Sequence, residues 1–279
     1  MQQLHEFIRV KSQQRGRNVV AFRHATCIVT LQRKLSGILK GSVVMPATVD
    51  SLKDFVRRLR PKYAKRRNRI KSLSTQEVFT DIYTSRHWGE GISVSGKGST
   101  PEATQHLAAS LPKLLREMGV RSIVDAPCGD FSWMKNIDLG VESYVGLDIV
   151  EPIVEQLRAD HESDHRSFGV ANLLDDDLPA CDMVFCRDCM LHLSFHDQRK
   201  LLKNFRRTEA KWYMMSTYPG AGRNRDIVTG EARPVDLTLS PIGLPQPEHF
   251  VEDRGDGLVE RGMGVWTKQQ LDAWAWNGY

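Results

Sequence analysis

Short apolar segments alternate with helical segments through the middle of this chain of 279 residues. The apolar segments have the length of strands, and the segments between them have helical spacing or a tight turn. The predicted strands cover residues 122–126, 143–149, 167–171, 182–186 and 212–217, and the predicted helices between them cover 131–137, 152–159 and 195–207. This order predicts an α/β domain with a Rossmann-like, three-layer architecture, in which helices cover both faces of a mostly parallel sheet.

The flanks of this alternation add further elements. Residues 75–83 and 101–118 have helical spacing, and the glycines in residues 88–100 predict an irregular loop between them. Residues 219–262 are rich in proline, glycine and charge, so we expect a long loop over the carboxyl edge of the sheet. A last strand is expected at residues 264–267.

The net charge of +5 conceals two oppositely charged parts. Residues 1–72 contain 18 Lys and Arg against three acidic residues, a net charge of +15, whereas residues 73–279 have a net charge of −10. Residues 51–60 have the spacing of a short amphipathic helix, and residues 62–71 are expected to be a charged linker. We therefore predict a basic, partly helical N-terminal extension of residues 1–72 and a folded domain of residues 73–279.

Such a basic extension can bind the phosphates of nucleic acid or make a peripheral contact with an anionic membrane surface. The alternatives are a solvated extension that contacts its own acidic domain and an organelle transit peptide. No stretch approaches the roughly 18 uninterrupted apolar residues that a transmembrane span needs. Five cysteines, an odd number in a long chain, argue against a disulfide scaffold. We therefore expect a reducing compartment, the cytoplasm.

Two neighbouring strands each end in an acid. Asp125 ends the first strand and is followed by a turn that contains Gly129 and by the expected start of a helix. Backbone N–H groups in such a turn, together with a helix N-terminus, favour a bound carboxylate. Asp148 ends the second strand, 19 residues after Gly129. An acid at that distance is well placed to accept hydrogen bonds from a ribose.

Together these motifs resemble the class I S-adenosylmethionine-dependent methyltransferases. The resemblance implies an enzyme that uses S-adenosyl-L-methionine as its cofactor, with Asp125 and Gly129 beside the methionine part and Asp148 at the ribose hydroxyls. The turn departs from the family, because two positions that are commonly glycine there are Pro127 and Phe131 here. The residues expected at the cofactor are Asp125, Pro127, Cys128, Gly129, Phe131, Asp148, Ile149, Asn172, Leu173 and Arg187.

Asn172 follows the third predicted strand. The family often has an acid or an amide at this point that reads the adenine edge, and an amide can both donate and accept. The alternative interpretation is that Asn172 caps a turn.

The segment of residues 182–193 resembles the family's fourth strand and the loop that faces the transferred methyl group. It contains Asp188 and His192, which are our candidates for the general base that a hydroxyl acceptor needs. The alternatives are that Asp188 pairs with Arg187 or a helix N-terminus and that His192 is a packed, hydrogen-bonded histidine. Cys186, Cys189 and His192 have residue types that bind metals, but their spacing is too tight for the usual zinc knuckles. No metal site is expected.

The stretches 125–133 and 186–193 are also similar to a bacterial subgroup of small methyltransferases, associated with glycan or small-molecule modification. The similarity extends from about Phe79 to Leu271, and it includes Trp88-Gly89, residues 95–99 and residues 224–227 with Gly230 and Arg233. It implies methyl transfer to a small-molecule or glycan acceptor, through a hydroxyl group. The alternatives are an RNA methyltransferase that uses the basic extension and a non-catalytic nucleotide-binding module. A nicotinamide-dependent dehydrogenase is disfavoured, because no G-x-G-x-x-G follows the first strand.

Overall fold

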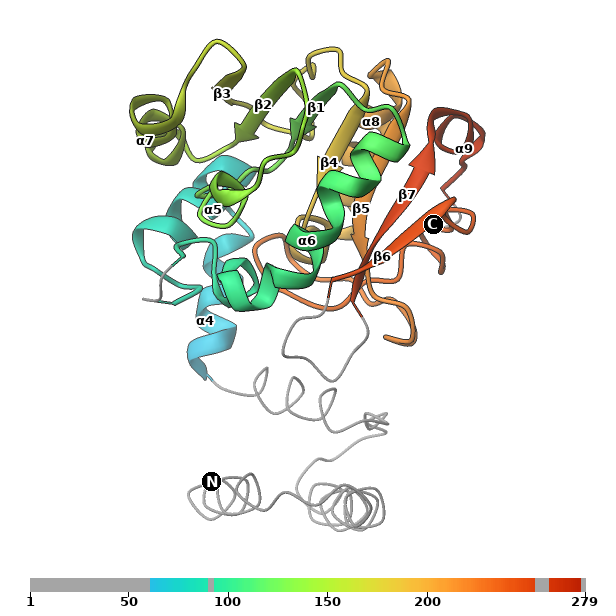
Figure 1. Cartoon of the computed structure of the whole chain (residues 1–279). Coiled ribbons are helices and arrows are strands. Elements are labelled where there is room, and N and C mark those ends of the chain that lie inside the picture. The colour runs from blue at the N-terminus through green and yellow to red at the C-terminus, as the bar shows by residue number, and fades with distance from the viewer. Residues whose placement is uncertain (1–60, 90–92, 254–260, 277–279) are drawn as a thin grey trace, which may run out of the picture. The chain divides into compact units, whose positions relative to one another are not determined.

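The computed structural model describes residues 61–89, 93–253 and 261–276 (Figure 1). The chain divides into two units, residues 1–66 and residues 67–279. Only residues 61–66 of the first unit are described, so the account below concerns the second unit. The helix predicted at residues 51–60 lies outside the described residues.

Helix α4 (Pro61–Ile70) occupies the stretch that was predicted to be a charged linker, so that prediction is wrong. The reason is an apolar contact at the end of the helix, where Ile70 is buried in a small cluster with Val78 and Ile82. These two residues belong to α5 (Thr75–Thr84), whose N-terminus is closed by a capping box.

The sheet has seven strands among the described residues, in the order β3-β2-β1-β4-β5-β7-β6. The strands are β1 (Ser122–Asp125), β2 (Ser143–Asp148), β3 (Arg166–Val170), β4 (Met183–Cys186), β5 (Trp212–Thr217), β6 (His249–Glu252) and β7 (Gly262–Thr267). Strands β1 to β5 run parallel, and β7 is antiparallel to both β5 and β6. The five predicted central strands are therefore confirmed. The strand order reverses between β1 and β4, and ligands bind at such a point in open α/β sheets.

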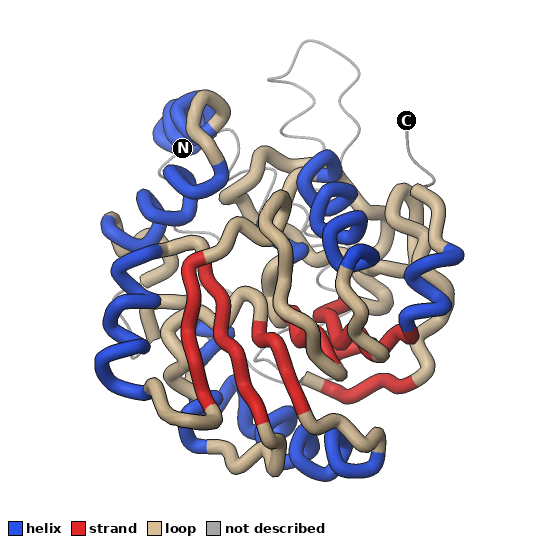
Figure 2. The backbone as a smooth tube through the Cα atoms, turned by 90° about the horizontal axis from the view of Figure 1, so that it is seen from above, coloured by secondary structure: helices blue, strands red, loops and turns tan. Residues whose placement is uncertain are grey.

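Helices cover both faces of the sheet, as predicted (Figures 1 and 2). One face packs against α6 (Pro101–Glu117) and α7 (Glu151–His161), and the other packs against α8 (Phe195–Arg207) and α9 (Lys268–Ala273). The fully buried leucines of α6 recur at helical spacing, at Leu107, Leu111 and Leu115. This regular spacing explains why the periodicity of the sequence located α6 so closely.

The predicted helix at residues 131–137 is absent, and only the short 3₁₀ helix η2 (Met134–Asn136) forms there. Phe131 adopts a left-handed backbone conformation, with φ 56°, which a helix cannot continue. Its ring is buried, with its centroid 5.3 Å from those of both Tyr144 and Phe168. Apolar packing on this face of the sheet therefore turns the chain away from a helix.

The described part of the long connection after β5 contains one strand that the sequence did not predict, β6. Before it, residues 218–248 form only turns, bends and irregular segments. Val235, Leu237 and Ile242 are nevertheless buried in the same core as α8. The buried side chain of Asn224 organises the loop, because its Nδ2 donates to the Asp236 carbonyl at 2.7 Å and its Oδ1 accepts from the Asp236 N–H at 3.0 Å.

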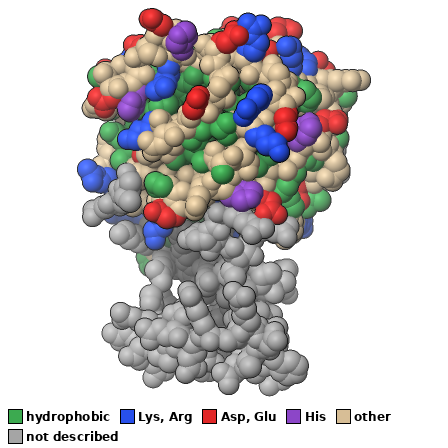
Figure 3. Space-filling model, viewed as in Figure 1, with side chains coloured by type: hydrophobic (Ala, Val, Ile, Leu, Met, Phe, Trp, Pro, Cys, Tyr) green, Lys and Arg blue, Asp and Glu red, His purple; other side chains and the backbone are tan. Residues whose placement is uncertain are grey.

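On the face drawn in Figure 3, basic and acidic side chains are interspersed over the coloured residues. Within the described parts of the chain, no helix combines the length and the apolar character that crossing a bilayer requires.

Candidate functional site

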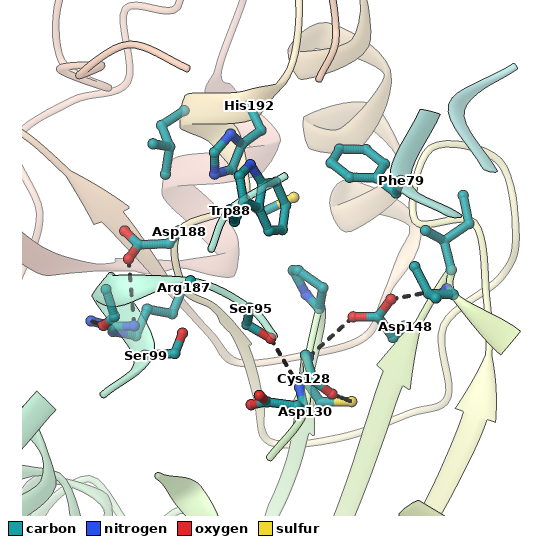
Figure 4. A pocket seen from close by; sticks show the side chains of 18 of the residues that line it. Phe79, Trp88, Ser95, Ser99, Cys128, Asp130, Asp148, Arg187, Asp188 and His192 are labelled. Carbon is teal, nitrogen blue, oxygen red and sulfur yellow. Dashed lines mark hydrogen bonds and ion pairs between the residues drawn. The ribbon is translucent and has the colours of Figure 1, made fainter. Parts of the chain in front are cut away.

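A cavity of about 490 Å³ opens at the carboxyl ends of β1, β2 and β4 (Figure 4). Its volume lies within the range of small-molecule sites. The predicted site residues that line it are Asp125, Pro127, Cys128, Gly129, Asp148, Ile149, Asn172, Leu173, Arg187, Asp188 and His192. Phe131 is the exception. Its ring packs in the core with Tyr144 and Phe168, so the structure does not bring it to the cavity.

Asp148 is held at the end of β2 by the backbone around it. Its Oδ2 accepts from the Gly129 N–H at 3.1 Å, and its Oδ1 accepts from the Val150 N–H at 3.0 Å. Burial raises the pKa of Asp148 to about 6, although these N–H donors lower it. Each carboxylate oxygen has a second lone pair, so Asp148 has the capacity to accept two more hydrogen bonds from a ligand.

Asp125 stands beside it at the end of β1, in the register that places it opposite Gly146 of β2. Its Oδ2 accepts from the Tyr144 hydroxyl at 2.5 Å. Burial raises the pKa of Asp125 to about 7, and the Tyr144 hydroxyl opposes this rise. Two buried carboxyl groups thus line one end of the cavity, and both titrate near neutral pH.

A covering loop, residues 93–99, closes over the Gly129 turn. The Ser93 hydroxyl and the Val94 N–H donate to Asp130 Oδ2 at 2.7 and 2.8 Å, and the Asp130 N–H donates to Ser95 Oγ at 3.0 Å. Gly129 has φ 56°, and a Cβ there would lie 2.5 Å from Ser95 Oγ. The turn therefore requires glycine, both for its backbone conformation and for the close approach of this loop.

The side chain of Asn172 caps the turn after β3. Its Oδ1 accepts from the Leu174 N–H at 3.2 Å, and its Nδ2 donates to Asp175 Oδ2 at 3.2 Å. Asn172 therefore caps a turn, as the alternative interpretation of the sequence predicted. It also lines the cavity.

Arg187 belongs to a buried ion network. Asp253, which is fully buried just after β6, accepts from Arg187 Nε at 2.8 Å and from Arg261 Nη2 at 3.1 Å. Arg187 Nη2 also donates to the Gly98 carbonyl at 2.8 Å. The network therefore ties the covering loop to the end of β6, and Asp253 balances one of the two guanidinium charges.

Asp188 also points into this network (Figure 4). Its Oδ1 accepts from the Tyr218 hydroxyl at 3.0 Å, and its Oδ2 lies 3.1 Å from Arg261 Nη1 and 3.4 Å from Arg187 Nη1. Burial alone would raise the pKa of Asp188, but the two guanidinium groups and the hydroxyl outweigh it and lower that pKa. An ion-paired carboxylate of this kind is a weak base.

His192 is the last residue of the 3₁₀ turn η3 (Met190–His192) and lies across the cavity from Asp148 (Figure 4). Its Nδ1 lies 3.0 Å from the Glu231 carbonyl oxygen. Its ring lies 4.6 Å from that of Trp88, with an interplanar angle of 31°, and Phe79 lies beyond Trp88 at 6.2 Å. A carbonyl oxygen only accepts, so the neutral imidazole carries its proton on Nδ1, and Nε2 is the basic nitrogen.

Several residues of the cavity were not predicted as site residues, namely Phe79, Ser95, Asp130, Tyr218 and Arg261. The glycine-rich texture of residues 88–100 gave a signal for the covering loop, and Trp88 in that loop was part of the resemblance. Tyr218 and Arg261 flank a stretch without periodicity, so no local pattern indicated them.

Known proteins resemble this chain in structure rather than in sequence. No family model and no curated protein matches the sequence. The magnesium protoporphyrin IX methyltransferase ChlM from Synechocystis PCC 6803, solved with bound SAM, aligns with a TM-score of 0.50 and 13% identity, over 70% of this chain and 97% of its own. The N-methyltransferase NodS from Bradyrhizobium japonicum WM9, in complex with S-adenosyl-L-homocysteine, aligns with a TM-score of 0.52 and 10% identity, over 67% and 98%.

The chain has the fold of the class I S-adenosylmethionine-dependent methyltransferases. The predicted fold class is confirmed. The same sheet order argues against the dehydrogenase alternative, because dinucleotide-binding sheets have the order 3-2-1-4-5-6. Here the antiparallel strand β7 lies between β5 and β6.

Proposed function

We propose that this chain is an enzyme that transfers a methyl group from S-adenosyl-L-methionine to a hydroxyl group of a small-molecule or glycan acceptor. One observation carries the proposal. A single cavity at the point where the strand order reverses has the carboxylates of Asp125 and Asp148 on one wall and the imidazole of His192 on another.

The cavity has the groups that this cofactor needs. S-adenosylmethionine supplies an electrophilic methyl group on a sulfonium. Asp148 would accept the two ribose hydroxyls through its remaining lone pairs, and Asp125 and the Gly129 turn would lie at the methionine part. The covering loop, fixed through Asp130 and Arg187, would keep water from this end of the cavity.

His192 fits the task of a general base better than Asp188. Its Nε2 is the unprotonated nitrogen of the neutral ring, because Nδ1 faces the Glu231 carbonyl. The acceptor's O–H proton would pass to Nε2 as the new oxygen–carbon bond forms and the carbon–sulfur bond breaks. Asp188 would instead orient Arg261 and Tyr218 along the acceptor side of the cavity.

The acceptor wall supports a compact ring-bearing substrate. Phe79, Tyr83 and Trp88 present aromatic surface there, and Leu191 adds an aliphatic contact. Aromatic faces pack well against both sugar rings and aromatic rings, while the alignment of acceptor and methyl supplies the larger part of the rate. An RNA acceptor would depend on the basic extension, most of which lies outside the described residues.

A transfer screen with radiolabelled methyl tests this proposal. The full chain is incubated with labelled S-adenosylmethionine and three panels: hydroxyl-bearing small molecules, oligosaccharides and RNA. His192→Ala and Asp148→Asn serve as parallel controls. We expect label in one of the first two panels, nearly independent of salt. Label only in RNA, with a steep loss as salt rises, would support the RNA alternative. Cofactor binding without transfer in any panel would favour the non-catalytic module.

A further inference from the structure

A turn from the long β5–β6 loop holds the wall that contains His192. The Gly230 N–H donates to the His192 carbonyl at 2.8 Å, and the next residue, Glu231, offers its own carbonyl to Nδ1 of the ring at 3.0 Å. The histidine is therefore fixed twice by consecutive residues, once through its backbone and once through its ring. The second contact also decides which nitrogen carries the proton.

The carboxylate of Glu231 in turn organises this turn. It is buried, with 2% of its side chain exposed, and its Oε2 accepts from the Val228 N–H at 3.0 Å. Its Oε1 lies 3.2 Å from Nε of Arg67, a residue of α4. Arg67 is partly exposed, with 37% of its side chain accessible, and its Nε makes this ion contact without hydrogen-bond geometry. The ion pair therefore joins α4 to the buried carboxylate in the turn of residues 228–231.

The same residue thus links a charge to the imidazole. The side chain of Glu231 forms an ion pair with Arg67, and its main-chain carbonyl oxygen accepts a hydrogen bond from Nδ1 of His192. A shift of the turn after loss of the Arg67 contact would move the carbonyl away from the ring. Arg233 fixes the other end of the wall, where its Nη1 donates to the carbonyls of Met190 and Leu191 at 3.0 and 2.9 Å.

We propose that Arg67 and Glu231 are a positioning pair for His192, which holds the imidazole as the Nδ1–H tautomer so that Nε2 takes the acceptor's proton. The inference rests on the proposed function, in which His192 is the base. It assigns a role in turnover to Arg67, which the charge pattern of the sequence placed in the basic extension rather than in the domain.

Arg67→Gln is the test variant, and Arg69→Gln is its matched control. Arg69 lies on the same helix and also forms an ion pair, to Asp81 at 2.8 and 2.6 Å, but that pair is on the surface and away from the cavity. We expect Arg67→Gln to lower kcat roughly tenfold, because loss of alignment without loss of the base costs less than the ~10² of a full misplacement. KM for S-adenosylmethionine should stay unchanged. Arg69→Gln should retain the wild-type kcat, and Arg67→Lys should restore most of it.

A double-mutant cycle separates positioning from a general loss of stability. If Arg67 acts through His192, Arg67→Gln should cause no further loss of kcat in a His192→Ala background. An equal tenfold loss in both backgrounds would overturn the inference. So would a wild-type kcat for Arg67→Gln in a protein whose His192→Ala variant is slow.

Nitrogen-15 NMR of labelled histidine gives a readout that does not depend on activity. We expect His192 to be the Nδ1–H tautomer in the wild-type chain and in Arg69→Gln, and to shift toward the Nε2–H tautomer in Arg67→Gln. An unchanged tautomer in Arg67→Gln would overturn the positioning role. If His192→Ala leaves kcat unchanged, the assignment of the base fails, and the tautomer measurement still decides whether Arg67 positions the ring.

Discussion

Cofactor affinity should fall below pH 6, because Asp148 must be ionised to accept two ribose hydroxyls. Burial raises the pKa of Asp148 to about 6 in the unliganded chain. When the carboxyl group is protonated, one of its oxygens becomes a donor and no longer accepts freely. Two hydroxyl donors favour the ionised form, so ligand binding draws the pKa down and expels a proton.

The size of the effect follows from that pKa. With a value of about 6, the ionised fraction is about 0.9 at pH 7 and about 0.1 at pH 5. The affinity for S-adenosylhomocysteine should therefore weaken about tenfold between these pH values, which corresponds to about 1.4 kcal/mol. Binding at pH 5 should release about 0.9 proton per cofactor.

The stability of the unliganded chain should depend on pH in the opposite direction to cofactor affinity. The pKa of Asp148 is raised from 3.8 to about 6, so the folded state binds the proton more tightly than the unfolded state. Its contribution to stability is present below about pH 3.8 and is lost as the pH rises through about 6. Asp148→Asn removes this titration, so the Tm of the unliganded wild type should fall as the pH rises through about 6 by more than the Tm of the variant.

Calorimetry at pH 5 and pH 7, in buffers of different ionisation enthalpy, measures both the affinity and the proton release. Asp148→Asn should bind weakly at both pH values and lack the proton release that is linked to Asp148. Any pH dependence that it retains reports Asp125, the neighbouring carboxyl group with a pKa of about 7. A wild-type affinity that is constant from pH 5 to pH 7, or a change in Asp148→Asn as large as the change in the wild type, would refute the assignment of Asp148 to the ribose.

Three other perturbations have defined outcomes. His192→Ala should cut kcat by roughly 10²-fold and abolish the acidic limb of the pH–rate profile, while cofactor affinity stays unchanged. Methyl-transfer assays over a range of pH would measure kcat, and calorimetry would measure the affinity. Gly129→Ala should weaken cofactor binding, because its Cβ would lie 2.5 Å from Ser95 Oγ and its φ of 56° disfavours alanine, and combining it with Ser95→Gly should restore only part of the affinity in calorimetry. The sequence predicted that residues 73–279 fold alone; melting followed by circular dichroism should show a lower Tm for that fragment than for residues 67–279, the compact unit of the structure.

The central strands could be predicted because parallel strands buried on both faces form near-continuous apolar runs. β4 is buried at every position and β5 at every position but its first. The edge strand β6 shows the limit of this signal, because His249, Phe250 and Glu252 are exposed and leave no apolar run to detect. The helix predicted after β1 does not form because Phe131 has a left-handed backbone conformation. The residue type of Phe131 alone does not indicate that conformation.

The cofactor wall was predictable for a similar reason, because Asp125, Gly129 and Asp148 belong to short motifs at the ends of adjacent strands. The part of the cavity formed by the ion network is instead assembled from segments that are distant in the sequence. Asp253 reaches Arg187 across 66 positions of the sequence, and Arg261 reaches Asp188 across 73. No local pattern encodes such pairs, so the ion network could not be found before the fold was known.

The two candidate bases show what tertiary contacts add to a motif. The sequence offered Asp188 and His192 as near equals, four residues apart in one loop. Asp188 has φ 51°, and its carboxylate lies among Arg187, Arg261 and Tyr218, which lower its pKa and occupy its oxygens. His192 ends the 3₁₀ turn η3, and its Nδ1 lies 3.0 Å from a carbonyl oxygen, which can only accept. The partners of each side chain, rather than its residue type, therefore separate an ion-paired acid from a histidine whose Nε2 can take a proton.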